Sequence, residues 1–369
     1  MNFLKEKKGI IFTGAVVGIL SVLLVYFGNP KNMGVCVACF LRDTAGALGL
    51  HRTDTVQYIR PEIVGIVLGA FLMAFGKKEF DSRGGSSPFI RFILGFVVMV
   101  GALMFLGCPL RMILRIGGGD MNAVVGLVGF AAGIGVGILF LNKGFSLKRN
   151  YKLNKMEGYL FPVINVVLIA LLVAAPAYIF FSQKAGTPGA SHAAIWISLG
   201  AGLIVGVLAQ RTRLCMVGGI RDLIMFKDSY LISGFISIFI FATIGNLIFG
   251  FYKFGFEAQP IAHADGLWNF LGMALAGWAS VLLGGCPLRQ LILSGEGNID
   301  SVITVLGMVV GAAFVHNFGL ASSAKGPTAN GKAAVLIGFA VLLLISYFNI
   351  EKAIKVNRKG DAGANVSTN

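Results

Sequence analysis

Charged residues are scarce in this sequence: 13% of its 369 positions are Asp, Glu, Lys or Arg, whereas 56% are hydrophobic. Its mean hydropathy of +0.82 excludes an ordinary soluble domain, in which about a quarter of the residues are charged. Hydrocarbon satisfies no backbone hydrogen bond, so a chain of long apolar runs must cross a membrane as helices. We therefore predict an all-α polytopic membrane protein and disfavour a β-barrel.

Several chemical signatures are missing as well. The sequence has no P-loop Gly-x-x-x-x-Gly-Lys-Ser/Thr, which argues against ATP hydrolysis by this chain. Its four histidines show no metal-binding spacing, and the single C-x-x-C at Cys36 and Cys39 has no second ligand pair. We expect no metal, no cofactor and no enzymatic activity. The net charge of +15 is attributed to basic loops beside anionic lipid headgroups rather than to nucleic-acid binding.

Ten apolar runs are long enough to span a hydrocarbon core of ~30 Å. A secretory signal is the alternative for the first run, but the run is too long and no small-residue cleavage site follows it. The predicted spans are 10–27, 61–76, 88–106, 122–141, 158–181, 193–209, 230–251, 267–284, 299–318 and 333–349.

The basic residues predict the orientation. Of the 31 Lys and Arg residues, 21 fall in the termini and in the gaps on the same side as the termini. The positive-inside rule then places both termini in the cytoplasm. We expect a multi-pass protein of the bacterial cytoplasmic (inner) membrane.

The pentapeptide Gly-Cys-Pro-Leu-Arg occurs twice, at 107–111 and at 285–289. A second element, Cys followed six positions later by Arg-Asp, also occurs twice, at 36–43 and at 215–222. The two elements keep nearly the same separation, 72 residues from Cys36 to Cys108 and 71 from Cys215 to Cys286. Two independent motifs in one register indicate an internal duplication.

Each half of the duplication contributes five spans, and an odd number turns the second half over. The sequence therefore predicts an inverted-topology repeat of the kind found in many transporters. We divide the chain into a first repeat half at 1–157, the fifth span and a connection at 158–192, a second half at 193–350 and a polar cytoplasmic tail at 351–369.

The four motif segments are too short and too interrupted to span. We predict re-entrant or broken half-helices at about 34–50, 108–118, 213–227 and 286–296, because irregular backbone at membrane depth is tolerated where protein or a polar pathway covers it. The alternative is a set of surface loops that are alike only because of the duplication.

The recurring cysteines are the main candidates for function. Pro is favoured at the first position of a helix, so Pro109 and Pro287 make Cys108 and Cys286 natural N-cap residues, whose sulfur faces a positive helix end. Inversion arranges Cys36 and Cys108 toward one side and Cys215 and Cys286 toward the other. The predicted result is a column of thiols, although buried cysteines also occur as small hydrophobes.

Four arginines recur within the motif segments, where a buried guanidinium needs a function or a partner. We assign them to anion recruitment or gating, with the neighbouring carboxylates in support, and keep headgroup contact or helix capping as the structural alternative. These residues are Arg42, Arg111, Arg221 and Arg289, with Asp43 and Asp222.

At these motifs the sequence resembles the YeeE/YedE family of bacterial membrane proteins, over essentially the whole chain and most closely in its selenium-metabolism branch. The resemblance implies an inverted-repeat helical fold and a narrow pathway lined by Cys108, Cys215 and Cys286, with Cys36 as a further candidate. It also implies relay of thiosulfate through transient S–H···S hydrogen bonds in a related branch, and an association with small cytoplasmic sulfur-carrier proteins of the TusA type. Cys39 departs from the internal symmetry, because its counterpart is Gly218.

We therefore predict a transporter that imports a small selenium or sulfur compound by relay along the cysteines. One alternative is a membrane-embedded transferase that forms a cysteine persulfide or selenosulfide. Another is a non-catalytic membrane scaffold for selenium metabolism. The sequence leaves the element, its oxidation state, the energy source and the oligomeric state open.

Overall fold

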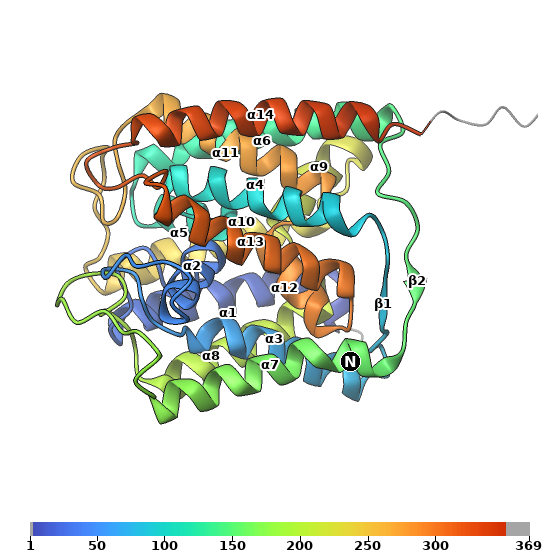
Figure 1. Ribbon diagram of the computed structural model, residues 1–369. Coiled ribbons are helices and arrows are strands. Elements are labelled where there is room, and N and C mark those ends of the chain that lie inside the picture. The colour runs from blue at the N-terminus through green and yellow to red at the C-terminus, as the bar shows by residue number, and fades with distance from the viewer. Residues whose placement is uncertain (1–2, 352–369) are drawn as a thin grey trace, which may run out of the picture.

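The computed structural model describes residues 3–351, and its long helices run side by side in one bundle (Figure 1). The prediction for the tail at 351–369 lies almost wholly outside the described residues. The long helices are α1 (Lys7–Tyr26), α3 (Pro61–Gly76), α4 (Pro88–Phe105), α6 (Met121–Asn142), α7 (Lys155–Ala174), α8 (Ile195–Thr212), α10 (Tyr230–Ile248), α11 (Gly266–Leu282), α13 (Ile299–Asn317) and α14 (Ala329–Phe348).

Within the described chain, nine helical segments are long and apolar enough to cross a membrane. The remaining long helix, α3, is apolar but has only 16 residues, about 24 Å at 1.5 Å per residue. Large apolar side chains such as Val166 on α7 and Leu343 on α14 lie exposed, as a lipid-facing surface requires. The predicted all-α polytopic fold is confirmed.

The fifth span differs from its prediction. The apolar run predicts a span to residue 181, but α7 ends at Ala174. Ala175 adopts a left-handed conformation with φ 43°, and Pro176 follows it. Proline has no backbone N–H for a continuing helix, so the run breaks although its composition stays apolar.

Both ends of the described chain lie at one end of the bundle, on the right in Figure 1. We call this end the terminal face and the other end the opposite face. At the terminal face the 3-10 helix η1 (Phe3–Lys5) precedes α1, and strands β1 (Arg83–Gly84) and β2 (Tyr151–Lys152) pair antiparallel. The loops that join α7 to α8 and α13 to α14 lie at the opposite face.

The packing of the long helices follows the duplication. Helix α1 packs on α10 and α3 on α8, while α4 packs on α13 and α6 on α11. Exchanging the two halves converts the first contact into the second and the third into the fourth. This is the pattern that two halves related by a two-fold axis produce, and the inversion itself stays a prediction. The fifth crossing of each half departs from it, because α7 packs on α3 and α14 packs on α4 and α11.

Four short helices occupy the predicted half-helix positions. They are α2 (Val37–Ala47), α5 (Pro109–Gly117), α9 (Met216–Phe226) and α12 (Pro287–Gly295). The segment before α2 re-enters the bundle, because Gly34 lies directly against the backbone of Ser21, more than a turn inside the end of α1. Such buried chain breaks are possible because protein surrounds them.

Glycines allow the closest helix contacts, and one of them yields a test. A Cβ at Gly133 of α6 would overlap the carbonyl oxygen of Ala274 on α11, whereas a Cβ at Gly135 would meet nothing within 4 Å. We predict that Gly133→Ala destabilises the protein by about 1–3 kcal/mol through overpacking, measured by thermal unfolding in detergent. Gly135→Ala is the matched control and should melt no earlier than the unsubstituted protein. Equal melting of both variants would contradict this packing.

Candidate functional site

Each duplicated cysteine stands at the N-terminus of one short helix. Cys36, Cys108, Cys215 and Cys286 are the N-cap residues of α2, α5, α9 and α12. Proline occupies the first turn of α5 and α12, as predicted. A helix N-terminus carries unpaired N–H groups and partial positive charge. Four such ends therefore converge on four thiols.

The sulfur atoms do not all cap in the same way. Cys36 Sγ accepts a hydrogen bond from the Cys39 backbone N–H at 3.3 Å, and Cys215 Sγ accepts one from Gly218 at the same distance. Cys108 and Cys286 make no such bond to their own helices. The prediction that Cys108 and Cys286 are N-cap residues is confirmed, and the sulfur of each turns toward the other cysteine of its half.

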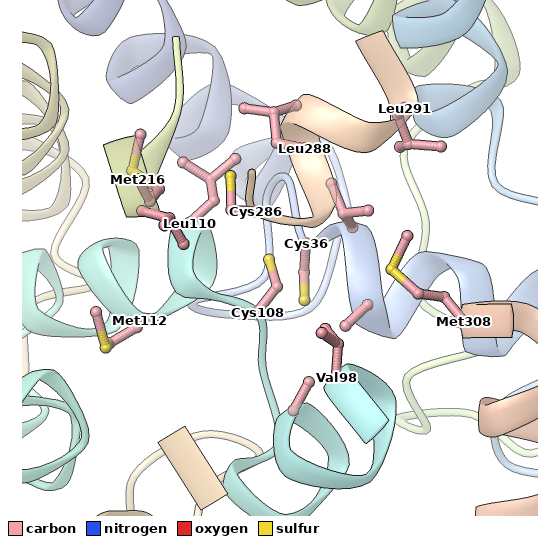
Figure 2. Close-up of a cluster of buried hydrophobic side chains, with 14 of the residues drawn as sticks. Cys36, Val98, Cys108, Leu110, Met112, Met216, Cys286, Leu288, Leu291 and Met308 are labelled. Atoms are coloured by element: carbon pink, nitrogen blue, oxygen red, sulfur yellow. The ribbon is translucent and has the colours of Figure 1, made fainter. Parts of the chain in front are cut away.

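The thiols form one pair in each half. In the second half, Cys215 Sγ lies 3.8 Å from Cys286 Sγ and accepts the Cys286 backbone N–H at 3.5 Å. In the first half, the equivalent side chains of Cys36 and Cys108 face each other (Figure 2). We call these the Cys36/Cys108 pair and the Cys215/Cys286 pair. All four cysteines are free thiols.

Apolar side chains enclose both pairs. Leu110 and Leu288, which are equivalent in the repeated pentapeptide, lie beside the thiols together with Met216 (Figure 2). No thiol of the four is more than 5% exposed. The structure therefore holds a closed arrangement, in which thiols and leucines fill the centre of the protein.

Arg111 is a buried guanidinium beside the Cys36/Cys108 pair. Its Nε donates to Asn32 O at 3.0 Å and its Nη2 to Ile261 O at 3.1 Å. Its Nη1 donates to the carbonyl of Leu106 and approaches Cys39 Sγ at 3.6 Å. In the part of the chain that the structure describes it forms no ion pair with a carboxylate, so its charge is available to stabilise an anion near the thiols.

Arg111 also caps the end of a helix, the alternative role that the sequence left open for the recurring arginines. Helix α4 ends at Leu106, a left-handed cap, and its last carbonyls would be unpaired at membrane depth. Arg111 takes the carbonyl of Leu106, and Arg115 takes that of Phe105 at 2.7 Å. In the second half a neutral side chain does this work: Gln290 Nε2 donates to the carbonyls of Leu283 and Gly285.

The Arg-Asp pairs predicted from adjacency do form, but in different settings. Arg42 Nη2 lies 2.6 Å from Asp43 Oδ1, and both are buried. The equivalent Arg221 and Asp222 pair at 2.8 Å and stay partly exposed, 25% and 17% by side chain. Asp43 therefore lies in the core of the first half, whereas Asp222 lies at the edge of the second half.

Two buried arginines escaped the sequence interpretation. Arg60 pairs with Asp43 at 2.8 Å and donates to backbone carbonyls of the loop between α7 and α8. Arg115 pairs with Asp120 at 2.7 Å and stacks its guanidinium on Phe105. Arg60 lies 17 residues after Asp43 and Arg115 lies within the predicted segment 108–118, but only their pairing in space reveals a partner.

One cavity opens at each face, a mainly polar one at the terminal face and a mainly apolar one at the opposite face. The terminal-face cavity measures about 450 Å³ and is lined by five cations and three acids. Its cations are Lys5, Arg83, Arg211, Arg213 and Arg289. Arg289 follows Cys286 by three residues, so this cavity reaches within about one helical turn of the Cys215/Cys286 pair. Arg289 also pairs with Glu296 at 3.2 Å.

The opposite-face cavity measures about 440 Å³. Arg42 lines it, as does Leu106, two residues before Cys108. It therefore approaches the Cys36/Cys108 pair as the terminal-face cavity approaches the other pair. Arg221 lines neither of these two cavities. No group of three or more His, Cys, Asp or Glu side chains among residues 3–351 is placed to hold a metal ion.

Known proteins are similar to this chain over part of its length. A family model described as "Sulphur transport" matches residues 211–360, which include both thiols of the Cys215/Cys286 pair. The thiosulfate transporter TsuA of Spirochaeta thermophila is 29% identical over 118 residues, 32% of this chain and 35% of the relative. TsuA of Escherichia coli is 26% identical over 116 residues, 31% and 32% of the two chains.

The match to these two curated relatives spans about a third of their length. The range matched by the family model includes both motif segments of the second half. The internal duplication relates these segments to those of the first half. The family model and the two relatives therefore show that parts of the chain are similar to sulfur-compound transport proteins, as the resemblance to the YeeE/YedE family leads us to expect.

Proposed function

We propose that this protein carries a small sulfur- or selenium-containing anion across the membrane by way of the two thiol pairs. The observation that carries the proposal is the placement of one buried thiol pair per half, each close in sequence to residues that line a cavity on its own face: Arg289 for the Cys215/Cys286 pair, and Arg42 and Leu106 for the Cys36/Cys108 pair. The names of the two relatives support a thiosulfate-like substrate. The suggestion of a selenium-containing substrate rests only on the family resemblance.

The chemistry of the site suits a soft anion. A thiol is a weak hydrogen-bond donor and a polarizable partner, so it can hold a terminal sulfur or selenium atom without trapping it. Helix N-termini and Arg111 supply the positive potential that replaces the water shell of the anion. Conduction needs weak sites in series, and the Cys36/Cys108 and Cys215/Cys286 pairs provide two.

Passage requires the centre to open. Leu110 and Leu288 are each about 1% exposed and pack beside the thiols, so they bar water and hard ions from a dry path. Because the breaks before α5 and α12 join short helices to long ones, small shifts of the short helices would move these leucines. The anion would then pass from one thiol pair to the next.

We propose that the terminal face is cytoplasmic and that transport is inward, because 21 of the 31 basic residues belong to that side. The cations of the terminal-face cavity would receive the anion on arrival. A TusA-type sulfur-carrier protein is a proposed recipient there. The membrane in question is the bacterial cytoplasmic membrane.

A transferase remains the second candidate because of one distance. Cys215 Sγ and Cys286 Sγ are 3.8 Å apart. The thiolate of one could attack the outer sulfur of thiosulfate, or the selenium of selenosulfate, to form a persulfide or selenosulfide with release of sulfite, and the other thiolate could then accept that outer atom. This candidate predicts a stable mass increase on Cys286 after exposure to thiosulfate, whereas a relay predicts none. A scaffold would tolerate loss of every motif cysteine. Intact-protein mass spectrometry and uptake assays separate the three.

The relay predicts a defined loss on removal of one thiol. In proteoliposomes, Cys286→Ala should lower uptake of radiolabelled thiosulfate at least about tenfold, the effect of about 1.4 kcal/mol less stabilisation along the path. Ser346→Ala is the matched control, since Ser346 is a fully buried hydroxyl on α14 that has no partner among residues 3–351. Uptake by Cys286→Ala at the level of the Ser346→Ala control would contradict the relay mechanism.

The orientation can be tested with single exposed cysteines, because the five native thiols are buried. A membrane-impermeant maleimide should label Gln183→Cys, at the opposite face, in intact cells. It should label Arg149→Cys, at the terminal face, only after permeabilisation. The reverse pattern would contradict the orientation and with it the inward direction.

A further inference from the structure

The opposite-face cavity contains a histidine that the relay does not use. His316 lines this cavity at the end of α13. Its Nε2 is buried, and within residues 3–351 neither ring nitrogen has a hydrogen-bond partner. A buried polar atom without a partner is costly, so such atoms usually have a ligand or a water. An imidazole in this state can offer an N–H to a guest.

The surroundings fix this ring in place. His316 stacks on His51, with ring centroids 4.8 Å apart. His51 is itself committed: its Nδ1 accepts from the Thr53 backbone N–H at 3.3 Å, so its Nε2 carries the proton and donates to Arg42 O at 3.0 Å. His51 therefore holds both the His316 ring and the backbone of Arg42.

Arg42 presents a free donor to the same cavity. Its Nε and Nη2 bind Asp43, whereas its Nη1 has no partner among the described residues and Arg42 lines the cavity. Asp43 is shared with Arg60, so the charged groups behind the cavity carry one excess positive charge. The side chains of Thr53 and Thr55 add hydroxyls to the lining.

We infer that the opposite-face cavity is an oxyanion-binding site, in which Arg42 and His316 hold the oxygen atoms of a small sulfur or selenium oxyanion. Guanidinium and imidazole N–H groups bind hard oxygen atoms, whereas the thiols beyond Leu106 favour a soft atom. The inference rests on the proposed transport function and narrows its substrate. An anion with both oxygens and one soft atom, such as thiosulfate, satisfies both sites, and sulfide or selenide satisfies only the thiols.

Binding should show this division of labour. Purified full-length protein in lipid nanodiscs is titrated calorimetrically with thiosulfate and with sulfate. We expect both to bind, and His316→Phe, which keeps the stacking on His51, to weaken both at least about tenfold through loss of a charge-assisted hydrogen bond. His192→Phe is the matched control, because His192 also stacks on an aromatic ring, that of Tyr58, and does not line the cavity. It should bind as the unsubstituted protein does.

Two outcomes overturn the inference: no oxyanion binding by the unsubstituted protein, or unchanged binding by His316→Phe. If His316→Phe melts early, Thr55→Val decides in its place, and unchanged affinity contradicts the site. Failure of the transport proposal is distinguishable. Protein that binds oxyanions through His316 but takes up no thiosulfate keeps the site and loses the function. Uptake that is normal in both His316→Phe and Thr55→Val, with unchanged binding, keeps the function and loses the site.

Discussion

The structure depends on satisfying backbone polar groups at helix breaks inside the membrane, where hydrocarbon offers no hydrogen bonds. Helix α4 stops at Leu106, and guanidinium groups of Arg111 and Arg115 take its last two carbonyls. Cysteine sulfur caps α2 and α9, and proline opens α5 and α12. The groups that make the breaks tolerable are thus the same groups that line the candidate pathway.

The two halves satisfy the carbonyl groups at these helix breaks with side chains of different charge. In the first half Arg111 and Arg115 serve the break, and with Arg42 and Arg60 they outnumber Asp43 and Asp120. In the second half the neutral amide of Gln290 serves it, and Arg289 is left to line the terminal-face cavity. An anion would therefore meet buried positive charge beside the Cys36/Cys108 pair and further positive charge in the terminal-face cavity.

The sequence was sufficient for the architecture, because hydropathy and duplication are local signals. Apolar runs located the long helices to within a few residues, and the repeated motifs located the four short ones. The end of α7 was missed because Ala175 takes a left-handed conformation that composition does not show. The role of Cys39 was left open, and it lies 3.6 Å from Arg111.

The details of the site were beyond the sequence because they join residues far apart in the chain. Nothing in the spacing pairs Arg60 with Asp43, places His316 on His51, or turns Cys286 toward Cys215. The repeat suggests equal roles for Arg221 and Arg42, which the structure places in unlike surroundings. Symmetry in sequence gave the positions of side chains, and burial decided what each can do.

In the proposed relay, the two thiol pairs select a soft atom on a small anion. The most direct measurement compares initial uptake of radiolabelled thiosulfate and sulfate by the unsubstituted protein in the same proteoliposomes, since the two anions differ by one sulfur in place of one oxygen. The account predicts that thiosulfate enters at least about tenfold faster, equivalent to about 1.4 kcal/mol of discrimination. Equal rates for the two anions would contradict it.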